Sequence, residues 1–134
     1  RSIEIPMIYK LKKNIEFRIV YRRGKSFAND LLVLYVLKNN RNKDKDNSLY
    51  NKVGISVSKK VGNSVVRSRS KRLILENYRL KQENINKKGY DFVFVARTKI
   101  KDKSYHDVAK AMDNLFNKAG LYNEKNNTVS DKNV

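Results

Sequence analysis

The order of apolar and polar residues along the chain predicts a short helix near its beginning. Apolar side chains recur at helical spacing between Lys12 and Gly24, with Phe17 and Tyr21 one turn apart. Asn14 is expected to cap this helix, and Gly24 is expected to end it. The two aromatic rings would therefore lie side by side on one face of the helix.

Two strands and a polar connection are predicted next. Leu31 to Leu37 is a continuous run of Leu, Val and Tyr, and Val53 to Ser58 alternates apolar with small residues. The segment between them, Asn39 to Lys52, is rich in Asn, Lys and Asp and has no apolar period. We interpret this segment as a long, solvated and mobile loop that joins the two strands as a hairpin.

A second helix is predicted from about Ser64 to Lys81. At 100° per residue, its core side would consist of Val66, Leu73, Leu80 and, at the margin, Ile74. The rest of its circumference is basic, with one acid, Glu76, among the residues Arg67, Arg69, Lys71, Arg72 and Arg79. The outward face of this helix is therefore expected to be a basic stripe.

The remaining pattern predicts one more strand and a final helix. Tyr90 to Ala96 is an aromatic and β-branched run, as expected for a buried strand. A helix capped by Ser104 then continues to Gly120, with apolar residues at helical spacing. The order α-β-β-(β)-α-β-α predicts an α+β fold in which a small mixed sheet and the helices form a two-layer sandwich.

The length of the chain suits one domain rather than two. We divide the 134 residues into an N-terminal extension (1–9), a single domain (10–122) and a flexible polar tail (123–134). Within the extension, Arg1 to Pro6 precede Met7, which we take as the natural start.

The charge of the chain predicts a polyanionic partner. There are 31 Lys and Arg against 13 Asp and Glu, a formal net charge of +18. Nucleic acid is the leading candidate, because each phosphate neutralised by Lys or Arg releases counterions. A membrane surface is disfavoured, since the chain has neither an apolar run of about 18 residues nor a strongly apolar amphipathic helix. The lack of Cys excludes disulfides and thiolate metal sites and, with no apparent secretory signal, predicts a cytoplasmic location.

The segment from Gly54 to Arg72 concentrates the candidate chemistry. A strand leads into a tight turn and a helix, along which basic residues follow closely: Lys59, Lys60, Arg67, Arg69, Lys71 and Arg72. Cations three or four residues apart on a helix repel each other, so their density favours a compensating anion. Backbone N–H groups at a helix start and bidentate Arg side chains both suit phosphate. The alternative interpretation is an ordinary solvated face.

The same segment resembles a known family. Residues 55–63, Ile-Ser-Val-Ser-Lys-Lys-Val-Gly-Asn, and residues 66–74, Val-Arg-Ser-Arg-Ser-Lys-Arg-Leu-Ile, closely resemble the signature of the bacterial ribonuclease P proteins. Phe17 to Tyr21, Gly24 to Asn29 and Leu34-Tyr35 look like the N-terminal half of that family. The resemblance extends over about Lys10 to Tyr122.

The resemblance implies a fold and two binding surfaces. It implies a left-handed crossover between parallel strands, as in a ribosomal small-subunit protein, where the general expectation is right-handed. A catalytic RNA would dock against Lys59, Lys60, Asn63, Arg67, Arg69, Lys71 and Arg72. A cleft lined by Phe17, Tyr21 and Tyr35 would hold the single-stranded 5′ leader of precursor tRNA. Aromatic rings suit that cleft because any base can stack on them, although their spacing alone favours core packing.

Two positions depart from the family pattern. Ser68 stands where the family usually has Asn, and Leu75 stands where it usually has Arg. A helical wheel places Leu75 in the middle of the basic arc. We therefore expect that an RNA contact in this turn is lost or is supplied by a neighbour such as Arg79.

No pattern in the chain is typical of a protein nuclease. Asp44 and Asp46 lie in the polar loop, and Asp30 stands alone beside a strand. His106 has no evident partner acid or base. We therefore expect no catalytic residue and no cofactor bound by the protein alone. The resemblance implies that an RNA partner performs the hydrolysis with Mg²⁺.

The resemblance thus implies the accessory protein subunit of ribonuclease P, an endoribonuclease that removes the 5′ leader from precursor tRNA. Its partners would be the catalytic RNA and precursor tRNA, with no membrane and no protein partner required. The alternative is a general RNA-binding module of ribosomal-protein type. A self-sufficient ribonuclease ranks last, because the chain has no cluster of catalytic groups.

Overall fold

The computed structural model describes residues 7–122, so residues 1–6 of the expected extension and the expected flexible tail, 123–134, lie outside the described residues. The elements are β1 (Tyr9–Lys10), α1 (Asn14–Arg23), β2 (Lys25–Ala28), β3 (Leu32–Lys38), β4 (Lys52–Ser56), α2 (Ser64–Lys81), η1 (Gln82–Asn84), β5 (Tyr90–Ala96), η2 (Thr98–Ile100) and α3 (Tyr105–Lys118). The predicted helices and strands are all present, and α2 has its predicted bounds. The α+β fold class is confirmed.

The strands form one mixed sheet in the order β1-β4-β5-β3-β2. The strands β1, β4 and β5 are parallel, whereas β3 pairs with β5 and β2 in the antiparallel sense. The predicted hairpin of β3 and β4 is therefore wrong, because β5 lies between them. In β5, Phe92, Val93 and Phe94 are fully buried, and a strand that is apolar on both faces is stable only in the middle of a covered sheet.

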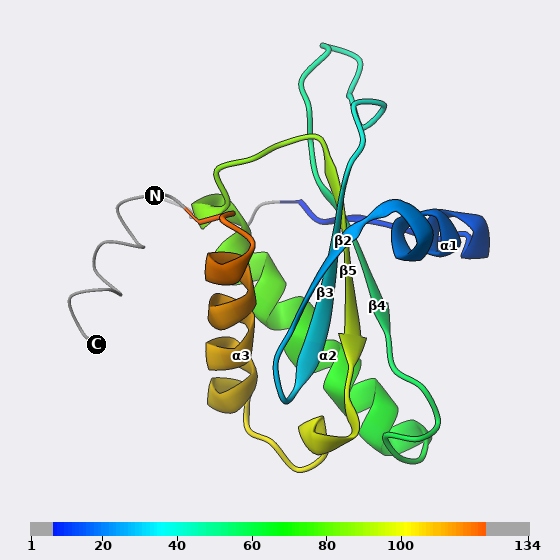
Figure 1. The fold of residues 1–134 in the computed structure, drawn as a ribbon, viewed down its shortest axis with the longest axis vertical. Helices are drawn as coiled ribbons and strands as arrows, with labels where there is room; N and C mark the ends of the chain where they lie inside the picture. Colours follow the sequence, from blue (N-terminus) through cyan, green and yellow to red (C-terminus); the bar gives the residue numbers. More distant parts are fainter. Residues whose placement is uncertain (1–6, 123–134) are drawn as a thin grey trace, which may run out of the picture.

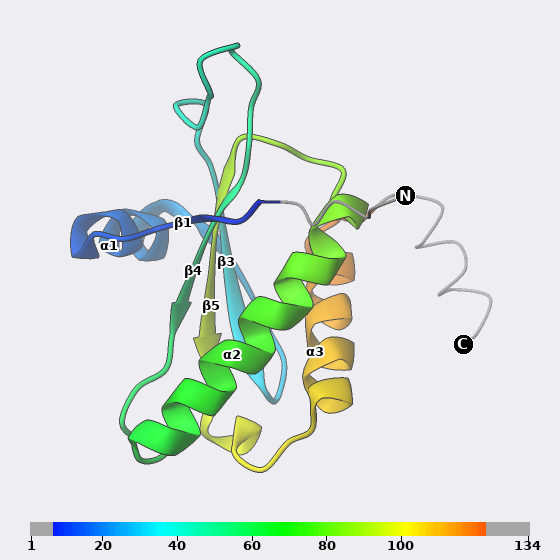
Figure 2. The ribbon, with the colours of Figure 1, turned by 180° about the vertical axis from the view of Figure 1, so that it is seen from behind.

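Helix α2 connects the parallel neighbours β4 and β5. It lies in front of the sheet in Figure 2. When the strands of that view are turned to point upward, β5 lies to the left of β4, so the crossover is left-handed. The handedness that the family resemblance implied is thus present, against the general right-handed preference.

The principal core lies between the sheet and the pair α2 and α3, which are packed side by side (Figures 1 and 2). Its largest buried side chains, Tyr78, Phe92, Phe94 and Phe116, meet in edge-to-face ring contacts. Helix α1 packs through Val20 on the opposite face of β5, against Val93. The predicted layer of sheet and helices is present, and α1 adds a partial third layer.

The buried face of α2 differs from the predicted one. Its buried residues are Ser70, Ile74, Asn77 and Tyr78, whereas Leu80 is 56% exposed and Val66 and Leu73 are only partly buried. Asn77 can be buried because its Nδ2 donates to the carbonyl oxygens of Leu73, at 3.0 Å, and Tyr105, at 3.4 Å. The helical wheel, which counted only apolar residues, placed the face incorrectly for this reason.

The connection between β3 and β4 is more structured than a solvated loop. It projects beyond the end of the sheet (Figure 1). At its base Asn42, 2% exposed, donates through Nδ2 to the buried carboxylate of Asp91 at 2.8 Å, and Asn39 Nδ2 donates to the same carboxylate at 2.9 Å. Further out, a bridge joins Lys43 to Leu49. The loop is therefore tied to β5 through polar side chains, which the apolar pattern does not detect.

Candidate nucleic-acid interface

Three aromatic side chains come together where α1 meets the sheet. The rings of Phe17 and Tyr21 on α1 have centroids 6.4 Å apart, and Tyr21 meets Tyr35 on β3 edge to face at 5.0 Å. Tyr21 is 37% exposed, and the other two are partly buried. The structure thus brings together the three residues predicted to line the leader cleft. Their rings pack on one another and remain accessible at the edge of the α1 core.

The pairing register shows what lies beside these rings on the sheet. Tyr35, Val93 and Gly54 are aligned across β3, β5 and β4, and two residues along on the same face are Val33, Val95 and Ser56. These last three side chains are only partly buried. They continue the sheet surface beyond the aromatic rings. Sequence analysis missed them because the face of a strand follows from the strand order, which local patterns do not reveal.

A groove of about 650 Å³ runs between α1 and the end of β4, and we call it the aromatic cleft. It is lined by Asn14, Phe17, Arg18, Tyr21, Ile55, Ser56, Val57 and Lys71. The α2 side chain Lys71 therefore faces this cleft rather than the middle of the predicted basic stripe. The cleft combines ring faces with two cations, Arg18 and Lys71, a combination suited to unpaired nucleotides.

Next to the aromatic cleft is a smaller and more apolar hollow of about 340 Å³ between β1, β4 and α2. Phe17 and Lys71 line both spaces, and Arg72 and Leu75 line the hollow. Leu75 also packs against the principal core. It therefore does not occupy the centre of an exposed basic arc, as the helical wheel suggested. Arg79, the proposed substitute for a contact there, is paired with Glu76 one turn earlier.

The other basic residues surround the beginning of α2. Lys59 and Lys60 are exposed in the turn before the helix. Asn63 is the N-cap, and its Oδ1 accepts from the Val66 N–H at 3.0 Å. Two Arg side chains are oriented by backbone carbonyls: Arg67 Nε donates to Gly62 at 3.2 Å, and an Arg69 Nη donates to Lys103 at 2.9 Å. The predicted set thus surrounds the first half of α2 instead of forming one face.

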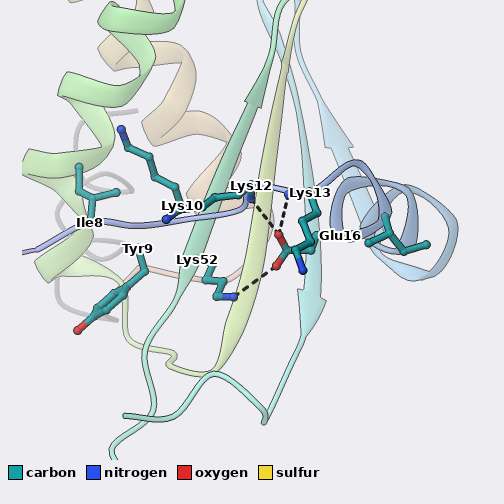
Figure 3. A pocket seen from close by; sticks show the side chains of 8 residues that line it. Ile8, Tyr9, Lys10, Lys12, Lys13, Glu16 and Lys52 are labelled. Carbon is teal, nitrogen blue, oxygen red and sulfur yellow. Dashed lines mark hydrogen bonds and ion pairs between the residues drawn. The ribbon is translucent and has the colours of Figure 1, made fainter.

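A larger groove, about 890 Å³, lies along β1 and the start of α1 (Figure 3). Its lining includes Lys10, Lys12, Lys13 and Lys52, opposed by Glu16. The Glu16 carboxylate accepts from the backbone N–H groups of Lys12 and Lys13, each at 2.9 Å, and lies 3.4 Å from Lys52 Nζ. These backbone hydrogen bonds, the one from Lys13 first, lower the pKa of Glu16 despite partial burial. Glu16, and not the predicted Asn14, thus caps α1, which begins at Asn14.

The acidic residues and the single His of the described part of the chain lie apart from one another as far as metal binding is concerned. No three His, Asp or Glu side chains within residues 7–122 are placed to hold a metal ion. His106 is exposed at the start of α3. Its neighbour Asp107 exchanges capping hydrogen bonds with Ser104, and these lower the pKa of the Asp107 carboxyl.

No helix between residues 7 and 122 is both long enough and apolar enough to span a bilayer.

Known proteins resemble this chain closely. A family model described as Ribonuclease P matches residues 5–120. The ribonuclease P protein component of Clostridium botulinum (strain Eklund 17B / Type B) is 68% identical over 123 residues, covering 92% of this chain and 98% of the relative. That of Clostridium beijerinckii is 67% identical over 119 residues, covering 89% and 94%.

Solved structures agree. The RNase P protein of Staphylococcus aureus, solved at 2.0 Å, matches with a TM-score of 0.74 and 32% identity, covering 87% of this chain and all of that one. The RNase P protein from Thermotoga maritima matches with a TM-score of 0.67 and 27% identity, covering 79% and 93%. The family match spans α1, the aromatic cleft, α2 and α3. The chain therefore belongs to the ribonuclease P protein family, the RNA-binding protein components of a tRNA-processing endoribonuclease.

Proposed function

We propose that this chain binds the catalytic RNA of ribonuclease P and the 5′ leader of precursor tRNA, and so promotes endonucleolytic removal of the leader. The RNA would dock on the basic residues around the start of α2, namely Lys59, Lys60, Asn63, Arg67, Arg69, Lys71 and Arg72. The unpaired leader would lie in the aromatic cleft against Phe17 and Tyr21 and extend onto Tyr35, which is outside the cleft lining but meets the Tyr21 ring. No protein partner is required in this scheme, and the reaction would take place in the cytoplasm.

The observation that carries the proposal is the position of Lys71 between two surfaces of different chemistry. On one side, Lys71 lines the aromatic cleft with Phe17 and Tyr21. On the other, it lies one residue from Arg72 on α2, beside the basic residues that suit a folded RNA backbone. A leader held in the cleft would thus emerge next to the bound RNA. Stacking contributes about 1–3 kcal/mol per base and tolerates any base, as varied leaders require.

We assign the hydrolysis to the RNA partner. The described residues provide no cluster of metal ligands, so we propose that Mg²⁺ in the holoenzyme is bound mainly by RNA and supplies the activated water. The chain would contribute positive charge close to the substrate phosphates. Because RNA alone repels RNA, this contribution should be greatest at physiological salt and low Mg²⁺.

The direct test is cleavage of precursor tRNA by a bacterial ribonuclease P RNA at low millimolar Mg²⁺, with and without the chain. We expect strong stimulation that falls when the leader is trimmed to a nucleotide or two. Tyr21→Ala should remove most of the benefit of a long leader. Ile19→Ala on the same helix is a matched control, because Ile19 is 36% exposed and outside the cleft lining.

Three results would contradict the proposal. Tight RNA binding without stimulation would favour the alternative, a general RNA-binding module of ribosomal-protein type, which family membership makes the weaker candidate. Cleavage by the purified chain without added RNA would indicate a self-sufficient ribonuclease. If Tyr21→Ala and Ile19→Ala change the cleavage of long-leader and trimmed-leader precursors equally, the leader does not bind in the aromatic cleft.

A further inference from the structure

The segment that joins β5 to α3 carries positive charge that the proposed RNA-docking set does not include. Residues 97–103 read Arg-Thr-Lys-Ile-Lys-Asp-Lys, with Lys99, Lys101 and Lys103 at alternate positions and a single acid, Asp102. All three Lys are exposed. They form no ion pair with any residue between 7 and 122. We call Lys99, Lys101 and Lys103 the lysine triplet.

The backbone beneath the lysine triplet is held in a defined shape. Ile100 is fully buried in the principal core and anchors the segment. Successive turns surround it: the N–H of Ile100 donates to Arg97 at 3.0 Å, and the N–H of Lys103 donates to Ile100 at 3.1 Å. Asp102 has a φ of 68°, which turns the chain sharply between two lysines. Charges on such a preorganised segment bind a partner with a smaller entropy cost than charges on a free tail.

One hydrogen bond joins this segment to the basic helix. An Arg69 Nη donates to the carbonyl oxygen of Lys103 at 2.9 Å. Figure 2 shows η2 and the connection to α3 at the same end of the molecule as the N-terminal turns of α2. The remaining guanidinium donors of Arg69 can still bind phosphate, since Arg has five N–H groups. Arg69 therefore lies at the junction between α2 and the lysine triplet.

We propose that the RNA-docking surface continues from α2 across Arg69 onto the lysine triplet, which binds backbone phosphates of the catalytic RNA. This inference rests on the proposed function. Residues 97–103 contain no aromatic side chain, so the segment offers point charges for phosphates and no platform for stacking bases. Folded RNA suits it better than an unpaired leader, which the aromatic cleft on the other flank of α2 would hold.

The test compares two triple substitutions that remove the same charge. In Lys99→Ala/Lys101→Ala/Lys103→Ala the lysine triplet is removed. In Lys43→Ala/Lys45→Ala/Lys87→Ala three exposed lysines at the opposite end of the sheet are removed. Affinity for a clostridial ribonuclease P RNA is measured for both variants and wild type from low to physiological salt. Circular dichroism and thermal unfolding check that each variant is folded.

Loss of the triplet should weaken RNA binding by about tenfold or more relative to the control variant at physiological salt, because phosphate contacts are lost. Each lost contact should also reduce the magnitude of the negative slope of log K against log salt by about 0.9, the value for duplex DNA. A slope reduced by about 2 or more, with the control slope equal to wild type, supports the proposal. Equal affinities and slopes for the two variants overturn it while leaving the proposed function intact. If the wild-type chain binds an unrelated folded RNA as tightly as the ribonuclease P RNA, the proposed function itself fails.

Arg69 provides a second, independent readout. Arg69→Lys keeps the charge but loses the planar donor that reaches Lys103. If Arg69 positions the triplet, Arg69→Lys should weaken RNA binding less in the triplet variant than in wild type. Strictly additive losses would show that Arg69 and the triplet act separately.

Discussion

The ring of Phe17 lies directly against Gly54, at the junction of α1 and β4. A Cβ added to Gly54 would be only 2.6 Å from Phe17 Cζ and 3.1 Å from Leu11 Cδ1. The absence of a side chain at position 54 is therefore what allows α1 to bring Phe17 over the sheet. The aromatic cleft depends on this contact.

Gly54→Ala should displace the Phe17 ring and impair the cleft. We expect a loss of about 1–3 kcal/mol in the free energy of unfolding, because the site becomes overpacked. We also expect the affinity advantage of long-leader over trimmed-leader precursor tRNA to shrink. Gly54→Ala/Phe17→Leu should regain stability without regaining leader binding. If Gly54→Ala alone kept the wild-type difference in affinity between long-leader and trimmed-leader precursors, leader binding would not depend on the position of the Phe17 ring.

Charge reversal at Arg67 and Arg69 should abolish assembly with the catalytic RNA. Both side chains also donate to backbone carbonyls, so reversal also removes hydrogen bonds worth about 1 kcal/mol each to folding. Arg72→Glu avoids this complication, since the Arg72 side chain is exposed and makes no hydrogen bond or ion pair to another residue in the range 7–122. It should weaken RNA binding with an unchanged unfolding curve. Normal assembly of all these variants would place the docking face elsewhere.

Removing the carboxylate of Asp91 should destabilise the protein through the β3–β4 loop. Asp91→Ala removes the carboxylate that accepts from the amides of Asn39 and Asn42. The buried Asn42 amide then keeps only its longer hydrogen bond to the Tyr90 carbonyl oxygen, at 3.3 Å. We expect a loss of about 2 kcal/mol or more in urea unfolding, with faster hydrogen exchange in the loop. Asp46→Ala, at an exposed site of the same loop, should change stability by less than about 0.5 kcal/mol. Similar losses of unfolding free energy for Asp91→Ala and Asp46→Ala would refute a structural role for Asp91.

The cap on α1 should make stability depend on pH. The backbone N–H groups of Lys13 and Lys12 hold the pKa of Glu16 below its ordinary value in the folded state. Its ionised form therefore stabilises the fold above the ordinary pKa of a glutamate, and the benefit is lost as the pH falls through the folded-state pKa. Glu16→Gln resembles the protonated form and should be about 0.5–1 kcal/mol less stable than wild type at pH 7. The difference should disappear in acid. The measurement is urea unfolding at pH 7 and in acid, with the exposed-site variant Glu83→Gln as control. A stability difference between wild type and Glu16→Gln that stays constant with pH would contradict this prediction.

The sequence by itself determined the elements and much of their chemistry. Helix α2 and the basic residues around it follow from neighbouring positions, because helix periodicity is local. The family signature also identified Phe17, Tyr21 and Tyr35, and the structure brings these three together. Whether they bind a leader stays a prediction, as does the RNA contact of each α2 residue.

Only the tertiary structure decided how these parts face one another. The insertion of β5 between β3 and β4 separated the expected hairpin, and the burial of Asn77 and Ser70 set the face of α2. Because this face of α2 is turned toward the core, Lys71 lies in the aromatic cleft and Arg69 lies against Lys103. Such relationships depend on pairings between distant segments and on polar groups that become buried once their hydrogen bonds are satisfied. Neither is encoded in the spacing of apolar residues along one element.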